Sequence, residues 1–522
     1  MARRVSCALV LALALVWLVP SVALSDNNGK LEQQIAAVIG ADLYRHSSWG
    51  IAVADQATGD MLYELNSEKL FAPASTTKLF TVAAALDALG PDFKFTTSIY
   101  RTGELDERGL LHGNLILRAM GDPNLSGRTN ELGHLEFTNN DHTYAAFGDT
   151  ASVTDTHPLR GIDELVRQVH AAGVKELRDV LVDDRLFDHD QGSGSGPSLL
   201  TPIVVNDNVI DVIVTPDSAA GAPARMTLRP ATAYAQFDMS VETVDEERGT
   251  DVVVERVAAH RYTVRGNIAR GHSPLVRIAE VEDPAEFART LLIERLQVRG
   301  IRVRDSALAP MDRQSLPVVS EYSKLPVVAR LVSPPFSEAL RVILKVSHNL
   351  HASLLPLIVA SQKNERTLAA GLHFEGEFLR RCGIQPGSVS FGGGAGGTRA
   401  DWVSPQAVIS LLRAMSRRPD FRVYYDGLPI LGVDGTLADA VGFDSPVRGK
   451  MHGKTGTLVN FNMVDDKMLV GSKALAGYLT TATGRKVVIA LYMNNVEVGT
   501  AADLRVQGQV LGRLCEIIYG AL

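Results

Sequence analysis

The 522-residue sequence has few cysteines and few aromatic residues. Of its three cysteines, only Cys382 and Cys515 lie beyond the first apolar stretch. Two cysteines are too few for a disulfide framework or for a cysteine-based zinc site. They could pair in an oxidising compartment, and the sequence leaves that question open. Neither is placed like a nucleophile.

The sequence also lacks an excess of positive charge. The formal net charge is −7, and no basic run or basic patch interleaved with aromatic residues occurs. This gives no electrostatic basis for binding nucleic acid. With 46% hydrophobic residues and no internal repeat, the composition predicts a globular chain of two or three domains.

No spacing typical of metal ligands is present, and we expect neither a metal nor a cofactor. The stretch from Thr138 to His157 is polar and is expected to form a solvated loop. Its acidic residues and histidines are Asp141, His142, Asp149, Asp155 and His157.

Only the N-terminus carries a long apolar run. Arg3 and Arg4 precede apolar residues 5–19, and small residues follow, up to Ser25. The pattern predicts a secretory signal peptide over residues 1–25, cut near Ala23 or Ser25. The alternative is a membrane anchor, but the run is short for a span and polar residues follow it directly. We therefore expect a protein exported across the cytoplasmic membrane into the periplasm or an equivalent extracytoplasmic space, with at most peripheral membrane association.

The most informative stretch is Ala72–Gly90. Ser75 and Lys78 lie three apart, so a helix places both side chains on one face. Gly90 then ends that helix. In the first turn, free N–H groups can stabilise a developing oxyanion near Ser75. A lysine among apolar groups loses hydration, so its neutral form can accept the serine proton. Alone, a Ser-x-x-Lys match is weak, because a capped helix with a solvated lysine has the same pattern.

A second motif is Ser347-His348-Asn349, just before a predicted helix over residues 350–361. Its serine could relay a proton and its amide could hold a carbonyl. The bland alternative is a helix N-cap. The same pattern recurs by accident at Ser25-Asp26-Asn27. We assign no catalytic role to His348.

The third motif, Lys454-Thr455-Gly456-Thr457, is predicted to lie on a strand. It offers a cation and hydroxyls, and its glycine lets a substrate backbone approach closely. An ordinary surface strand is the alternative. The three motifs in this order, each on its expected element, form the set typical of serine β-lactamases and penicillin-binding proteins.

Beyond the signal, nearly the whole chain resembles the penicillin-binding protein 4 type of D-alanyl-D-alanine carboxypeptidase and endopeptidase. Further matching segments are Gly121-Asp122-Pro123, Ser333-Pro334-Pro335, Leu428-Pro429, Gly432-Val433-Asp434-Gly435-Thr436 and Ala476-Gly477-Tyr478. The resemblance implies an α/β fold of the α+β kind, a serine β-lactamase/DD-peptidase-like domain in which helices flank an antiparallel sheet. The predicted division is a catalytic domain over 26–92 and 326–522, with a large β-rich insertion over 93–325 that forms two subdomains.

Carried over residue by residue, the resemblance implies the following chemistry. Ser75 attacks the carbonyl of the penultimate D-Ala of a peptidoglycan stem peptide, and Lys78 takes its proton. Ser347 passes a proton to the leaving group. β-Lactam antibiotics would be covalent inhibitors of the same serine.

The resemblance also implies the binding groups. Asn349 and Thr455 hold the substrate, and Lys454 favours its carboxylate and helps to organise protons. The N–H groups of Ser75 and Thr457 form the oxyanion hole, with Gly456 allowing close approach. Asp183 resembles an aspartate of the insertion that reads the amino group of the stem peptide's side chain.

Two departures from the family pattern flank the predicted site. The glycine loop, residues 391–397, has Gly393 where the family usually has aspartate, and the connection Val459–Lys473 is longer than usual. Two other functions remain open. A class A β-lactamase is disfavoured because such enzymes lack the insertion and carry a deacylating glutamate motif that is not found here. A non-catalytic wall-binding or sensor protein would have no need of the intact motif residues.

Overall fold

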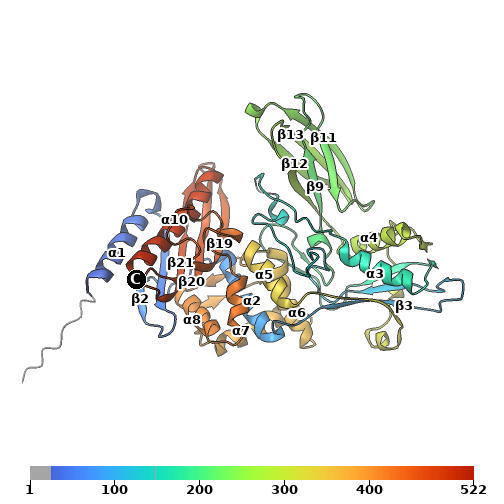
Figure 1. Ribbon diagram of the computed structural model, residues 1–522, viewed down its shortest axis with the longest axis horizontal. Coiled ribbons are helices and arrows are strands. Elements are labelled where there is room, and N and C mark those ends of the chain that lie inside the picture. Colours follow the sequence, from blue (N-terminus) through green and yellow to red (C-terminus); the bar gives the residue numbers. More distant parts are fainter. Residues whose placement is uncertain (1–24, 147) are drawn as a thin grey trace, which may run out of the picture.

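The structure, a computed structural model, describes residues 25–146 and 148–522 (Figure 1). The predicted signal peptide therefore lies outside the described residues, apart from Ser25. Within the described ranges, no helix combines the length and apolar character needed to cross a bilayer.

An antiparallel sheet forms the centre of the molecule, with strand order β19-β20-β21-β1-β2 and β22 paired to β20. Its strands are β1 (Ser48–Asp55), β2 (Met61–Leu65), β19 (Met451–Asn462), β20 (Lys467–Thr480), β21 (Lys486–Asn494) and β22 (Val496–Val498). Strands from the two ends of the chain thus meet in one sheet, and Figure 1 shows the blue and red strands side by side.

Both faces of this sheet are covered by helices. Side chains alternate along β1, because successive residues of a strand point to opposite faces. Ala52 and Ala54 join the core that contains Phe80, whereas Ile51 and Val53 join the core that contains Leu514. The first face carries α2 (Lys78–Leu89), α5 (Phe336–Val346), α6 (Asn349–Gln362), α7 (Leu368–Arg381), α8 (Pro405–Ser416) and α9 (Phe421–Gly427). The second carries α1 (Ser25–Ile39) and α10 (Ala501–Ala521). This arrangement confirms the predicted fold class.

The region between α2 and α5 builds a separate set of sheets with its own apolar core. One sheet has the order β16-β3-β4-β6, a second β10-β9-β14 and a third β11-β13-β12. The strands are β3 (Thr96–Arg101), β4 (Leu115–Arg118), β6 (Val180–Asp183), β9 (Val209–Thr215), β10 (Arg225–Arg229), β11 (Gln236–Val244), β12 (Asp251–Ala258), β13 (Arg261–Ala269), β14 (Leu275–Glu280) and β16 (Val327–Val332). Helices α3 (Arg160–Ala171) and α4 (Pro284–Val298) pack with them, and β11–β13 project away from the rest of the molecule in Figure 1.

Shorter strands complete the structure. They are β5 (Glu176–Leu177), β7 (Asp190–Gln191), β8 (Leu199–Leu200), β15 (Arg302–Val303), β17 (Val389–Ser390) and β18 (Trp402–Val403).

We propose to keep the division into a split catalytic domain and an inserted region. Its second boundary needs a shift, however, because β16 follows residue 326 yet pairs with β3 of the insertion. The return point lies at Phe336, where α5 begins.

Candidate active site

The first motif lies where a short 3-10 helix, η2 (Ala74–Thr77), leads into α2. The predicted single helix is thus two joined segments. Ala74 has a φ of 45°, which is strained backbone for a residue with a side chain, immediately before Ser75. Lys78 opens α2, and its Nζ lies 2.7 Å from the Oγ of Ser75. Ser75 is half-buried while Lys78 is fully buried, so the hydroxyl faces accessible space and the amine does not.

The surroundings of Lys78 favour its neutral form. Burial, followed by the charge of Lys454, holds the pKa of Lys78 well below its ordinary value, while Asp401 acts in the opposite direction. The amine nitrogen lies 2.7 Å from Asn349 Oδ1 and 2.9 Å from the carbonyl oxygen of Ala395. A neutral amine can donate its two N–H groups to these oxygens, and its lone pair is then left for the hydroxyl of Ser75. The geometry suits a base that accepts the serine proton.

The second motif begins at the end of α5. Ser347 has left-handed backbone with a φ of 66°, and it is buried. Lys454 Nζ donates to Ser347 Oγ over 2.8 Å and to the carbonyl oxygen of Thr455 over 2.9 Å. Burial lowers the pKa of Lys454 to about 7. A second lysine and serine therefore form a hydrogen-bonded pair in the same site.

The third motif lies on β19, at the edge of the sheet. Gly456 packs so closely on η2 that an added Cβ would lie 2.5 Å from the carbonyl oxygen of Pro73 and 3.2 Å from the nitrogen of Ser75. The Oγ1 of Thr455 donates to the Oγ1 of Thr436 over 2.7 Å. The strand edge, its hydroxyls and Ser75 thus share one site, and a glycine is required where the strand meets η2.

The family comparison agrees with this geometry. Residues 31–514 match the model of the D-Ala-D-Ala carboxypeptidase 3 (S13) family. The chain belongs to that family. It is a serine-type D-Ala-D-Ala carboxypeptidase, that is, a hydrolase of the DD-peptidase class.

Relatives and solved structures extend the match over nearly the full length. The D-alanyl-D-alanine carboxypeptidase of Actinomadura sp. (strain R39) is 27% identical over 99% of this chain and 91% of its own length. The D-alanyl-D-alanine carboxypeptidase DacB of Haemophilus influenzae is 26% identical over 87% of this chain and 86% of its own. The crystal structure of penicillin binding protein 4 (dacB) from Haemophilus influenzae superposes with a TM-score of 0.68 at 22% identity, covering 95% of this chain and 99% of that one. The same protein has also been solved with a β-lactam, and that structure superposes with a TM-score of 0.66.

The departure in the family's glycine loop has a nearby counterpart. Gly393 offers no charge, but Asp401, just beyond the loop, is buried near Lys78. Its charge acts to raise the pKa of Lys78, against the larger lowering effects of burial and Lys454. Its carboxylate accepts from the N–H groups of Gly392 and Thr398, which fixes the loop around Lys78. Sequence reasoning missed Asp401, because it lies eight positions after the expected residue.

The long connection between the third motif and Ala476 forms the hairpin of β19 and β20. In its register Lys473 lies opposite Thr457, and Lys473 Nζ donates to Thr457 Oγ1 over 3.0 Å. Burial lowers the pKa of Lys473 to about 8. Among the residues that the structure describes, no carboxylate lies within 4.0 Å of this ammonium. The sequence alone does not reveal that Lys473 lies opposite Thr457, because that depends on the register of the hairpin.

The Gly/Ser-rich stretch 191–198 reads in the sequence as a linker or flexible loop, but it packs against the second motif. Asn349 Nδ2 donates to the carbonyl oxygen of Ser195 over 2.9 Å. An added Cβ on Gly194 would lie 2.5 Å from the same amide nitrogen. The N–H of Gly397 donates to Ser193 Oγ over 3.2 Å. The stretch is therefore a wall of the site rather than a linker.

Asp183 ends β6 and is buried. Its carboxylate accepts from Arg185 Nε over 2.7 Å and from the hydroxyl of Tyr322 over 2.6 Å. Although burial opposes it, hydrogen bonding by these two partners lowers the pKa of Asp183. Recognition of a substrate amine by Asp183 stays a prediction, and it requires exchange of one of these partners.

The polar loop 138–157 is only partly solvated. Asp149, Asp155 and His157 are exposed, but the expectation is wrong for Asp141 and His142, which are buried. They belong to a cluster of charged and histidine side chains behind the second motif, here called the Asp207 cluster. Its members are Arg128, Asp141, His142, Asp207, Asp211, Arg229, His348 and His351.

Two triads of this cluster, Asp207 with His348 and His351, and Asp207 with Asp141 and His142, bring potential metal-ligand atoms within 4.8 Å of one another. The chemistry favours an ion-pair network instead. The guanidinium of Arg128 already lies 2.7 Å from both Asp141 and Asp207. His351 Nε2 already lies 2.6 Å from Asp207 Oδ1, a hydrogen-bond distance that leaves no room for an ion between the two atoms.

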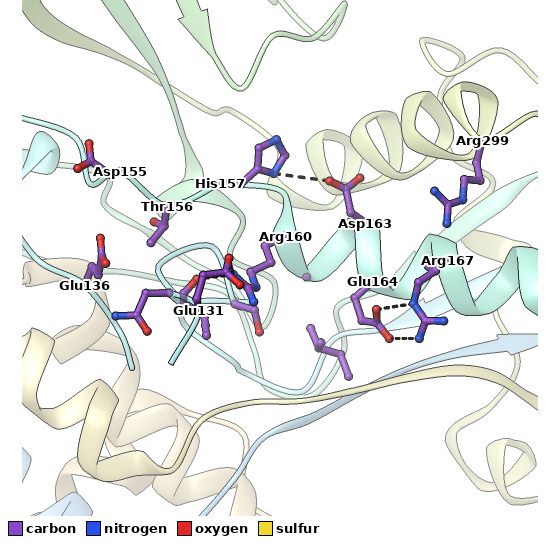
Figure 2. A pocket seen from close by; sticks show the side chains of 15 residues that line it. Glu131, Glu136, Asp155, Thr156, His157, Arg160, Asp163, Glu164, Arg167 and Arg299 are labelled. Carbon is purple, nitrogen blue, oxygen red and sulfur yellow. Dashed lines mark hydrogen bonds and ion pairs between the residues drawn. The ribbon is translucent and has the colours of Figure 1, made fainter. Parts of the chain in front are cut away.

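A separate cleft of about 730 Å³ lies in the inserted region (Figure 2). Its charged groups pair with one another: Arg167 with Glu164 at 2.7 Å, and Arg160 with Glu131 at 2.9 Å. No residue of the three motifs lines it. The two cysteines Cys382 and Cys515 are free thiols. Cys515 lies on α10 with its side chain buried in the core, and Cys382 follows the last turn of α7.

Proposed function

We propose that this carboxypeptidase cleaves the terminal D-Ala-D-Ala bond, or a cross-link bond of the same kind, in peptidoglycan stem peptides through an acyl-enzyme on Ser75. The carrying observation is the 2.7 Å distance between Lys78 Nζ and Ser75 Oγ, together with the lowered pKa of that lysine. A nucleophile needs a base within hydrogen-bond reach and in its unprotonated state; the distance meets the first condition, and the lowered pKa of Lys78 favours the second.

Acylation proceeds as follows in this proposal. Lys78 takes the hydroxyl proton of Ser75 as Oγ bonds to the carbonyl carbon. The backbone N–H groups of Ser75 and Thr457 stabilise the oxyanion. Ser347 gives its proton to the leaving nitrogen as the C–N bond breaks. Lys454 reprotonates Ser347 through their 2.8 Å hydrogen bond. At the end of acylation Lys454 is neutral, and Lys78 carries the proton that it took from Ser75.

Deacylation reverses the use of the same groups. A water molecule attacks the ester carbonyl while Lys454, left neutral by acylation, takes one of its protons through Ser347, and Lys78 returns its proton to Ser75 as the C–O bond breaks. The products are a shortened peptide and free D-Ala, or two peptides when the leaving amine comes from a cross-link.

Substrate binding uses the edge of β19 and the amide of Asn349. We assign the substrate's C-terminal carboxylate to the hydroxyls of Thr455 and Thr457 and to the lysine charges beside them. Lys454 donates two hydrogen bonds to groups of the protein, whereas Lys473 donates one. Lys473 is therefore the more available cation at neutral pH.

β-Lactams are proposed to acylate Ser75. A β-lactam complex of the Haemophilus influenzae protein and a relative named penicillin-sensitive carboxypeptidase A, from Dictyostelium discoideum, support this. The substrate class and the apolar N-terminal segment together support an extracytoplasmic location, with peripheral membrane association at most.

The test is the Ser75→Ala variant incubated with a fluorescent penicillin and with a D-Ala-D-Ala pentapeptide. Covalent labelling and D-Ala release should both vanish, while the melting temperature stays close to that of the parent protein. Labelling that persists at the parent level would exclude Ser75 as the nucleophile. Prompt turnover of the penicillin by the parent protein would instead indicate a β-lactamase.

A further inference from the structure

Ser347 holds a backbone conformation that it does not favour. Left-handed φ is unfavourable for a residue with a side chain, so neighbouring groups must hold it. One of them is Tyr144 of the inserted region, whose hydroxyl donates to the carbonyl oxygen of Ser347 over 2.5 Å. Lys454 holds the hydroxyl of the same serine from the other side.

His348, the next residue, points away from the reacting groups and into the insertion. Its ring is fully buried and stacks on His351 at 3.6 Å. The Nδ1 of His348 accepts from the backbone N–H of His351 over 3.3 Å. A neutral ring that accepts at Nδ1 carries its proton on Nε2.

The Nε2 atoms of both rings lie near one carboxylate oxygen, but only that of His351 forms a hydrogen bond with it. His351 Nε2 lies 2.6 Å from Asp207 Oδ1, and His348 Nε2 lies 3.2 Å from the same atom. The other oxygen, Oδ2, lies 2.7 Å from Arg128 Nη2 and 2.8 Å from His142 Nε2. Asp207 therefore links the second motif to the charged interior of the insertion.

The charges that face Asp207 keep it ionised. Its pKa is lowered well below the ordinary value because Arg128 and the histidines outweigh the effect of burial. Burial, followed by the charge of His348, lowers the pKa of His351 to about 4. Although burial opposes it, Asp211 and Asp141 raise the pKa of His142 to about 10. Three carboxylates then balance Arg128, Arg229 and a charged His142.

The backbone around Asp207 is shaped for this contact. Asn206, Asp207 and Asn208 are all left-handed, with φ of 48°, 55° and 55°. Three such residues in sequence are costly, and asparagine and aspartate are the residues that tolerate this conformation best. The turn brings the carboxylate of Asp207 from the insertion to the start of α6.

We infer that Tyr144 and Asp207 are positioning residues that hold Ser347 in its proton-transfer geometry, so that the inserted region completes the catalytic site. This inference rests on the proposed role of Ser347. Misplacing a reacting group by about 1 Å can cost about 100-fold in rate, so a contact that fixes Ser347 acts on the chemical step. The contacts on His348 explain why the middle residue of the motif is a histidine in a buried position.

The decisive experiment is a double-mutant cycle on the purified full chain, with the second-order rate of acylation by a fluorescent penicillin as readout. Tyr144→Phe removes only the hydroxyl. We expect it to lower this rate about 10-fold in the parent and to have no further effect in the Ser347→Ala background. Equal fold-losses in both backgrounds, or no loss in the parent, would overturn the inference.

A second pair of variants separates positioning from simple destabilisation. Asp207→Asn removes the charge that faces His348 and His351, while Asp179→Asn makes the same change at another buried, arginine-paired aspartate of the insertion that does not contact the motifs. We expect both to lower the melting temperature, but only Asp207→Asn to lower kcat for the pentapeptide, with KM nearly unchanged. Equal kcat losses would reduce Asp207 to a structural role. A parent protein that penicillin does not label would instead defeat the proposed function itself.

Discussion

Lys454 donates a hydrogen bond of 2.8 Å to the hydroxyl of Ser347, and both side chains are shielded from solvent. The cost of burying its charge brings the lysine close to half protonation at neutral pH, since its pKa falls to about 7. Under the proposed function, the protonation state of Lys454 therefore contributes to the pH dependence of substrate binding.

The first prediction follows from that value. Above about pH 7, Lys454 loses its charge, so the KM of a peptide with a free C-terminal carboxylate should rise with pH. A matched peptide ending in a carboxamide should not show this limb. The measurement is KM against pH for the two peptides, and parallel profiles would contradict the assignment.

Lys473 gives the second prediction. Lys473→Met should lower kcat/KM about 10-fold or more for the free-acid peptide and leave the carboxamide nearly unchanged, because a charge pair in a partly enclosed site is lost. Lys467→Met is the control, since Lys467 is on the same hairpin but pairs with Glu497. Equal losses on the acid and the carboxamide would remove Lys473 from the carboxylate site.

The third prediction concerns the glycine loop, residues 391–397. At Gly396 the φ is 90°, and an added Cβ would lie 1.9 Å from the carbonyl oxygen of Ala74, beside the nucleophile. Gly396→Ala should therefore reduce penicillin labelling at least 100-fold. Gly387→Ala carries a comparable backbone cost at a φ of 81°, with open space around the new methyl group. It should lose stability but keep labelling; the contrary pattern would show that loop strain alone matters.

The fourth concerns the core of the insertion. Arg289 is fully buried, pairs with Asp179 at 2.6 Å and donates to several backbone carbonyls. Arg289→Met leaves that carboxylate unpaired, so the free energy of unfolding should fall by about 3–5 kcal/mol. Arg167→Ala removes an exposed ion pair and should leave the free energy of unfolding nearly unchanged. Chemical denaturation of the two variants measures both values.

Local pattern sufficed for much of this structure. The helix after Ser75, the strand carrying Lys454 and the hairpin of β1 and β2 follow from apolar periodicity and turn residues that lie close together in the sequence. The three motifs were identifiable because each spans only three or four consecutive residues.

Contacts between distant segments were not accessible in the same way. Asp141 and His142 lie in a loop whose composition favours solvent, and only Arg128 and the carboxylates of β9 and its preceding turn make their burial tolerable. Likewise, Lys473 faces Thr457 because of a hairpin register that residue types do not determine.

The central sheet carries a consequence for biosynthesis. β21, from near the C-terminus, lies between β20 and the N-terminal strand β1. The ribosome therefore produces the nucleophile hundreds of residues before the strands that complete its surroundings. While translation continues, the nascent chain holds a serine and a lysine but no assembled cleft, and hydrolytic competence arrives only with the last strands.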